Sequence, residues 1–121
     1  MERRLTELEH DVLGYLLSVE FPGVRELRHQ LQGACVTGTW SSSGRSPSIY
    51  IKVGDNLPVA PILGEIAPVR AIVRSEDGEP VGELILWLTD GKLSALEYAW
   101  VTDRMPSQLP HVKAIELSVA D

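Results

Sequence analysis

The chain is 121 residues long, carries a formal net charge of −6 and is 44% apolar, which suffices for one folded domain with its own core. Its acidic balance argues against nucleic-acid binding, because that function needs basic surface to displace phosphate counterions. A single cysteine excludes an internal disulfide, and no apolar run is long enough to span a membrane or to form a signal peptide. We therefore expect one cytoplasmic domain over residues 1–121, helical in 1–33 and an antiparallel sheet in 34–121.

Two helices are predicted at the start of the chain. Thr6 and Glu9 form the T-x-x-E pattern of a capping box, which satisfies free amides at a helix start. An apolar stripe at the helical period follows, made of Leu8, Val12, Tyr15, Leu16 and Val19. The Phe21-Pro22-Gly23 sequence should end this helix, and a second helix is expected from Val24 to Leu31 with Gly33 as its left-handed terminator.

The pattern then changes to the alternation typical of strands. Strands are expected at 34–40, 48–53, 69–74, 81–89, 92–101 and 112–119. The SSSGRSP sequence predicts a flexible hairpin tip between the first two strands, and the proline-rich segment 54–68 predicts an ordered crossing loop. Helices followed by strands predict an antiparallel α+β fold, with both helices on one face of a mainly meander sheet of about five to six strands.

The Asp90-Gly91 dipeptide predicts a two-residue hairpin turn, which would set the pairing of the strands on both sides. Leu88 would then oppose Leu93, and Leu84 would oppose Glu97, so that Glu97 lies among leucines on the helix-facing side. The opposite face would carry Trp87, Leu96, Tyr98 and Trp100. A second two-residue turn at Asp77-Gly78 would pair Ala71 with Leu84 and agrees with the same faces.

Both features have alternative interpretations. Glu97 could lie near the sheet edge or pair with an arginine or tyrosine from a helix, and otherwise it could contact a ligand where helices and sheet meet. The aromatic face could be covered by the 54–68 loop and the C-terminal tail, and otherwise it could bind a partner.

No motif predicts an enzyme. His10, Asp11 and His29 match no metal-ligand spacing, and the serine-rich stretch from Ser41 to Ser46 lacks the lysine of a phosphate-binding loop. The sequence therefore predicts no catalytic residue, no cofactor and no metal.

The segment GELILWLTDGKLSALEYAW, followed by Asp103, Met105-Pro106 and Leu109-Pro110, resembles the C-terminal signature of small bacterial proteins that are frequent in actinobacteria and mostly uncharacterised. Some similar short acidic α+β proteins are immunity proteins, which neutralise a toxin domain of a polymorphic or contact-dependent system. The resemblance covers residues 81–112, is weaker in the N-terminal helices, and implies no active-site residue.

We hypothesise a non-enzymatic protein-binding module, an immunity-type inhibitor that occludes the basic active site of a toxin. The predicted partner-binding residues are Glu83, Trp87, Asp90, Glu97, Tyr98, Trp100 and Asp103. The carboxylates would supply charge and the aromatic side chains would anchor the partner. The alternative is a small-molecule-binding or scaffold subunit with Glu97 at a pocket between helices and sheet. Neither function involves nucleic acid or a membrane, and a homodimer is compatible with both.

Overall fold

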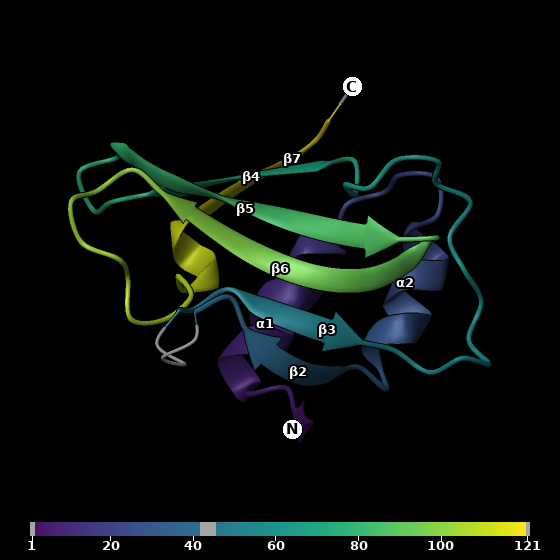
Figure 1. Ribbon diagram of the computed structural model, residues 1–121. Coiled ribbons are helices and arrows are strands. Elements are labelled where there is room, and N and C mark those ends of the chain that lie inside the picture. Colours follow the sequence, from purple (N-terminus) through teal and green to yellow (C-terminus); the bar gives the residue numbers. More distant parts are fainter. Residues whose placement is uncertain (1, 42–45, 121) are drawn as a thin grey trace.

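The computed structural model describes residues 2–41 and 46–120, so residues 42–45 of the expected hairpin tip lie outside the described part of the chain. The described residues form two α-helices and one seven-stranded antiparallel sheet, which confirms the α+β class (Figure 1). The elements in chain order are β1 (Arg3–Arg4), α1 (Glu7–Leu16), α2 (Val24–Leu31), β2 (Cys35–Thr39), β3 (Ile49–Lys52), β4 (Val69–Arg74), β5 (Pro80–Thr89), β6 (Lys92–Trp100), the 3-10 turn η1 (Val112–Ala114) and β7 (Ile115–Val119).

The strand count and the topology differ from the prediction. The sheet has seven strands rather than five to six, and the additional strand is β1, which is too short for an alternation pattern to reveal. The spatial order is β1-β2-β3-β6-β5-β4-β7, so only β4, β5 and β6 form a meander. The segment 54–68 carries the chain past the β5–β6 hairpin, which lets β3 pair with β6.

The two helices largely follow their local signals. The capping box of α1 is confirmed: the Glu9 amide donates to Thr6 Oγ1 at 3.1 Å, and the Thr6 amide donates to Glu9 Oε1 at 2.8 Å. Helix α1 ends at Leu16, before the Phe21-Pro22-Gly23 sequence, whereas α2 has the predicted bounds. Gly33 is not a left-handed terminator, because α2 closes with a tighter turn in which the Gly33 amide donates to the Gln30 carbonyl at 3.3 Å.

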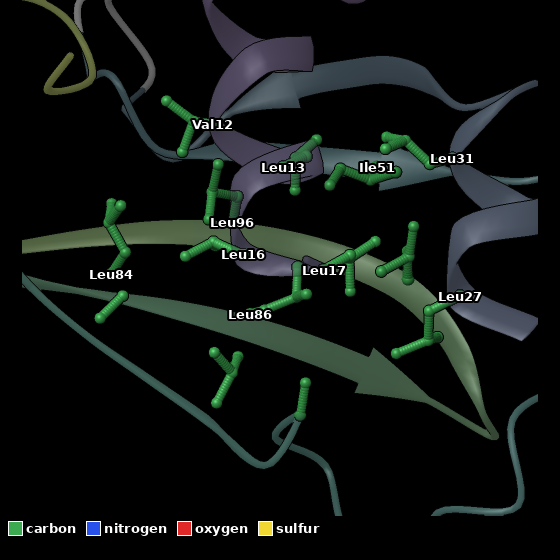
Figure 2. Close-up of a cluster of buried hydrophobic side chains, with 14 of the residues drawn as sticks. Val12, Leu13, Leu16, Leu17, Leu27, Leu31, Ile51, Leu84, Leu86 and Leu96 are labelled. Carbon is green, nitrogen blue, oxygen red and sulfur yellow. The ribbon is translucent and has the colours of Figure 1, made fainter. Parts of the chain in front are cut away.

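Both helices lie on one face of the sheet, which we call the inner face (Figure 1). Their apolar stripes meet the inward-facing side chains of the central strands in one core. Figure 2 shows this cluster, in which Val12, Leu13, Leu16, Leu17, Leu27, Leu31, Ile51, Leu84, Leu86 and Leu96 are all buried. The opposite face, which we call the outer face, carries no helix of the described chain.

The pairing of β5 with β6 corrects the predicted faces. The Asp90-Gly91 turn is confirmed, with φ of 51° and 78° at the two residues and with Thr89 opposite Lys92. A β-bulge at Ser94 then shifts the register by one residue, so that Trp87 opposes Ala95 and Ile85 opposes Glu97.

Such a shift moves every later side chain of β6 to the other face. Leu96 and Tyr98 therefore lie buried in the inner face, with 0% and 6% exposure, and Glu97 lies on the outer face. The prediction that Glu97 lies among leucines was wrong, and so was the prediction that Leu96 and Tyr98 lie on the outer face. Trp100 opposes Gly82 and so falls on the inner side of the pleat at the end of β6.

The turn between β4 and β5 is also longer than predicted. The Ser75 amide donates to the Glu79 carbonyl at 2.8 Å, so residues 76–78 form a three-residue loop with Gly78 at a φ of 84°. A bulge at the start of the hairpin compensates for the extra residue. Ala71 therefore still opposes Leu84 as predicted.

Candidate binding surface

The outer face carries a continuous row of apolar side chains that crosses the sheet. Ile66 lies beside Trp87 in an isolated bridge, Trp87 opposes Ala95, and Ala95 opposes Tyr50. Directly opposed residues of antiparallel strands project from the same face, so these four residues form one strip, which we call the outer-face row. Tyr50 and Ile66 are each 48% exposed, whereas Ala95 is covered between its neighbours.

Trp40 extends this row towards the β2 edge of the sheet. Its indole stacks on the Tyr50 ring, with centroids 5.8 Å apart and an angle of 19° between the planes. Stacking of this kind holds both rings in a defined orientation. The Trp40 side chain nevertheless remains 39% exposed.

Glu97 lies next to this row and is half-buried. Its Oε1 atom accepts a hydrogen bond of 3.0 Å from Trp87 Nε1, across the pair of strands. Neither form of the first interpretation of Glu97 holds, because β6 is a central strand and the partner is the indole of Trp87 in β5 rather than an arginine or tyrosine from a helix. The alternative function placed Glu97 at a pocket between helices and sheet, and the structure contradicts that placement because the helices cover the other face.

A cavity of about 460 Å³ opens beside Glu97 at the end of β6, and we call it the indole cavity. It is lined by Trp40, Ser41, Ser46, Ser48, Glu97, Tyr98, Ala99, Trp100 and Met105. Ser48 is buried and accepts a hydrogen bond of 2.8 Å from the Tyr98 amide, which ties β3 to β6 at the base of this region. Burial raises the pKa of the Tyr98 hydroxyl above its ordinary value.

The seven predicted partner-binding residues do not form one surface. Glu83, Trp87 and Glu97 lie on the outer face, and Glu97, Tyr98 and Trp100 line the indole cavity. Asp90 is exposed at the hairpin turn, beside a separate cavity of about 470 Å³ that the 54–68 loop helps to form. Asp103 is exposed in the loop after β6.

Sequence reasoning missed Trp40 and Tyr50 as members of this surface. The alternation of Ser48 to Val53 did separate Tyr50 from the inward-facing isoleucines, so its exposure was available as a signal. Nothing local indicates that β3 lies beside β6, and only that pairing brings Tyr50 into the same row as Trp87, with Ala95 between them. The proposed cover by the 54–68 loop is partial: the Leu88 amide donates to the Glu65 carbonyl at 2.7 Å, which places this segment alongside β5 while Tyr50 and Trp40 remain exposed.

Another cavity, of about 720 Å³, lies at the start of α1, and the Arg3–Glu9 ion pair lines it. Arg3 Nη1 and Nη2 donate to the two oxygens of Glu9, each at 2.8 Å. Burial by itself would raise the pKa of the Glu9 carboxyl, but the hydrogen bonds from Arg3 and from the Thr6 amide hold this pKa below its usual value. The carboxylate is thus stabilised in its charged form as part of the helix cap, an arrangement that suits structure rather than proton transfer.

Within residues 2–41 and 46–120, no group of three or more His, Cys, Asp or Glu side chains is arranged to hold a metal ion. None of the helices in the described part of the chain is both long and apolar enough to cross a bilayer. Comparison of the chain with family models, with curated proteins and with solved structures gave no match.

Proposed function

We propose that this chain is a non-enzymatic protein-binding module that contacts its partner through the outer face of the sheet. The observation that carries the proposal is the outer-face row, extended by the stacked Trp40, on a face that no helix of the described chain covers. Tryptophan, tyrosine and apolar side chains dominate the energetics of protein interfaces when they lie together on an open surface. When a partner covers apolar side chains that a sheet leaves in water, their burial stabilises the complex.

The charge of the β5–β6 hairpin supports a basic partner. Glu83, Glu97 and Asp90 project from the hairpin. Lys92 is the cation of the hairpin, and its ammonium group lies 3.8 Å from the carboxylate of Asp55. It is therefore already paired outside the hairpin. Carboxylates around an aromatic strip would steer a basic surface towards it and favour the correct orientation.

We infer further that the partner is a toxin domain and that the module acts as an immunity-type inhibitor in the cytoplasm. This step rests on the resemblance of residues 81–112 to small bacterial proteins and on the acidic hairpin, which would cover a basic active site. Inhibition would follow from occlusion alone, so it requires no catalytic group on this chain.

The test is binding to the proteins encoded beside this gene, measured by calorimetry with purified components. Tyr50→Ala and Ile66→Ala should each weaken binding about tenfold or more, because both side chains are exposed in the outer-face row. Arg25→Ala, at an exposed position of α2 on the opposite side, is the matched control and should leave affinity unchanged.

Thermal melting of each variant separates loss of binding from loss of folding. If Arg25→Ala weakens binding as much as Tyr50→Ala does, the outer face is not the interface. If no neighbouring protein binds and none loses activity in the presence of this chain, the immunity function is wrong.

A further inference from the structure

The indole cavity combines exposed aromatic side chains with a single carboxylate among its described lining residues. Its walls are formed by two tryptophans, Trp40 and Trp100, together with the thioether of Met105, and these side chains are 39%, 37% and 40% exposed. Glu97 is the one charged residue among the described residues that line it. We propose that this cavity receives an arginine side chain of the partner protein, an inference that rests on the protein-binding function proposed above.

The aromatic walls favour a cation. The face of an indole ring carries a negative electrostatic potential, and tryptophan is the best of the aromatic residues for attracting a cation within about 6 Å of the ring. Trp40 is already held in place by its stacking on Tyr50, so little conformational freedom would be lost when a guest enters. A planar guanidinium can lie flat against an indole, which a lysine ammonium cannot.

Glu97 supplies the counter-charge. Trp87 Nε1 donates to Oε1 of Glu97 and orients the carboxylate, and no arginine or lysine of the described chain forms an ion pair with it. The carboxylate is half-buried beside a cavity that contains no other charge among its described lining residues, so its attraction for a cation is screened less than at a fully exposed site. An arginine guanidinium offers paired N–H donors that match a carboxylate, which makes it the cation that satisfies the aromatic walls and Glu97 together.

The experiment uses an arginine analogue, so it does not require the partner. The indole N–H signals of the three tryptophans are followed by NMR during titration with N-acetyl-arginine amide and, separately, with N-acetyl-citrulline amide. Citrulline has nearly the same shape but a neutral urea group in place of the guanidinium. We expect the arginine compound to shift the Trp40 and Trp100 signals with a Kd of ~10 mM, and the citrulline compound to cause no saturable shift.

Variants locate the site. Glu97→Gln keeps an acceptor for Trp87 Nε1 and removes only the charge, so it should raise the Kd of the arginine compound about five- to tenfold. Glu83→Gln removes a charge from the same face outside the cavity and is the matched control, with a change of less than about twofold expected. Trp100→Leu should abolish the shift that the arginine compound causes at the Trp40 signal. The melting temperature of this variant shows whether its fold is kept.

Equal responses to the arginine and citrulline compounds would overturn the proposal, and so would equal effects of Glu97→Gln and Glu83→Gln or the absence of any shift. These outcomes leave the proposed function standing if a partner still binds in a manner sensitive to Tyr50→Ala. Conversely, if the arginine compound binds saturably but no protein encoded beside this gene binds the chain, the cavity assignment is correct and the immunity function is wrong.

Discussion

At the scale of single residues, Gln30 is the polar side chain on which three elements meet. It lies in α2 and is fully buried. Its amide nitrogen donates to the Pro58 carbonyl at 2.8 Å and to the Gly91 carbonyl at 3.0 Å, and its oxygen accepts from the Leu93 amide at 2.9 Å. This one side chain therefore ties the helix, the crossing loop and the hairpin together.

Gln30→Met tests that arrangement, because methionine has a similar size but no polar partner to offer. The Leu93 amide would be left buried without this hydrogen bond and the Pro58 carbonyl would lose its own, whereas the Gly91 carbonyl would keep the one from the Ala60 amide. We therefore expect a loss of about 1–3 kcal/mol in the free energy of unfolding. Gln32→Met, two residues later at an exposed position, is the control and should change stability by less than about 0.5 kcal/mol. Similar denaturation midpoints for the two variants would show that Gln30 does not have this role.

The lowered pKa of Glu9 predicts a dependence of stability on pH. A carboxyl whose pKa is lower in the folded chain stabilises that state above its unfolded pKa, about 4.3, and this contribution is lost as pH falls through the folded pKa. Glu9→Gln should therefore cost about 1 kcal/mol at neutral pH, with Arg3 partly exposed, and cost progressively less as the solution becomes more acidic than pH 4.

Denaturation of Glu9→Gln and of the parent chain from pH 7 to pH 2.5 measures this difference. Glu7→Gln, which removes an exposed charge from the same helix turn, separates the ion pair from a general effect of charge at the helix start. A Glu9→Gln difference that stays constant over the whole range would contradict the role of the ion pair.

At the scale of elements, the β5–β6 hairpin shows how a strong local signal and a long-range one combine. Asp90-Gly91 correctly predicted the turn, because both residues need a positive φ that glycine adopts readily and aspartate tolerates. The bulge at Ser94 has no comparable local signal. It buries Leu96 and Tyr98 in the inner face and leaves the carboxylate of Glu97 at the surface, whereas the unshifted register would have buried a charge.

Gly91 also allows the crossing loop to approach the hairpin. A Cβ atom at this position would collide with the carbonyl oxygen of Ala60. The Ala60 amide in turn donates to the Gly91 carbonyl at 2.9 Å. Gly78 also has a positive φ, but a Cβ atom there would meet no heavy atom within 4 Å. Gly91→Ala should therefore cost about 3–4 kcal/mol in unfolding free energy, against about 1–2 kcal/mol for Gly78→Ala.

Chemical denaturation of the two glycine variants measures the difference between their losses of unfolding free energy. Both glycines have a positive φ, so the cost of placing alanine in that backbone conformation cancels in the difference. What remains is the cost of separating residues 58–60 from the hairpin. Equal losses in the two variants would mean that the close approach is not important for stability.

At the scale of the whole molecule, the sheet has a rigid centre and weaker edges. Strand β6 is paired on both sides, by β3 and β5, whereas β7 is paired only with β4 and β1 contributes only two residues. Both helices pack on the central strands, where Leu86 and Leu96 are almost completely buried. The outer-face row crosses this same centre, so the proposed binding surface is built on the most constrained part of the fold.

Hydrogen exchange tests this distribution. The amides of Leu86 and Leu96 should exchange only through global unfolding, and those of β7 should open at a free energy lower by about 2 kcal/mol or more. Measurement of residue-resolved exchange rates by NMR gives both values in one experiment. Protection of β7 equal to that of β6 would show that the sheet opens as a single unit.

The sequence by itself determined the features that depend on neighbours in the chain. The capping box of α1, the bounds of α2, the strand at Val69–Arg74 and the turn at Asp90-Gly91 all follow from a few adjacent residues, and each is present in the structure. Only the tertiary structure decided the bulge at Ser94 and the pairing of β3 with β6. Both depend on which side chains are removed from water by segments distant in the sequence, and together they place Glu97, Trp87, Tyr50 and Trp40 on one face.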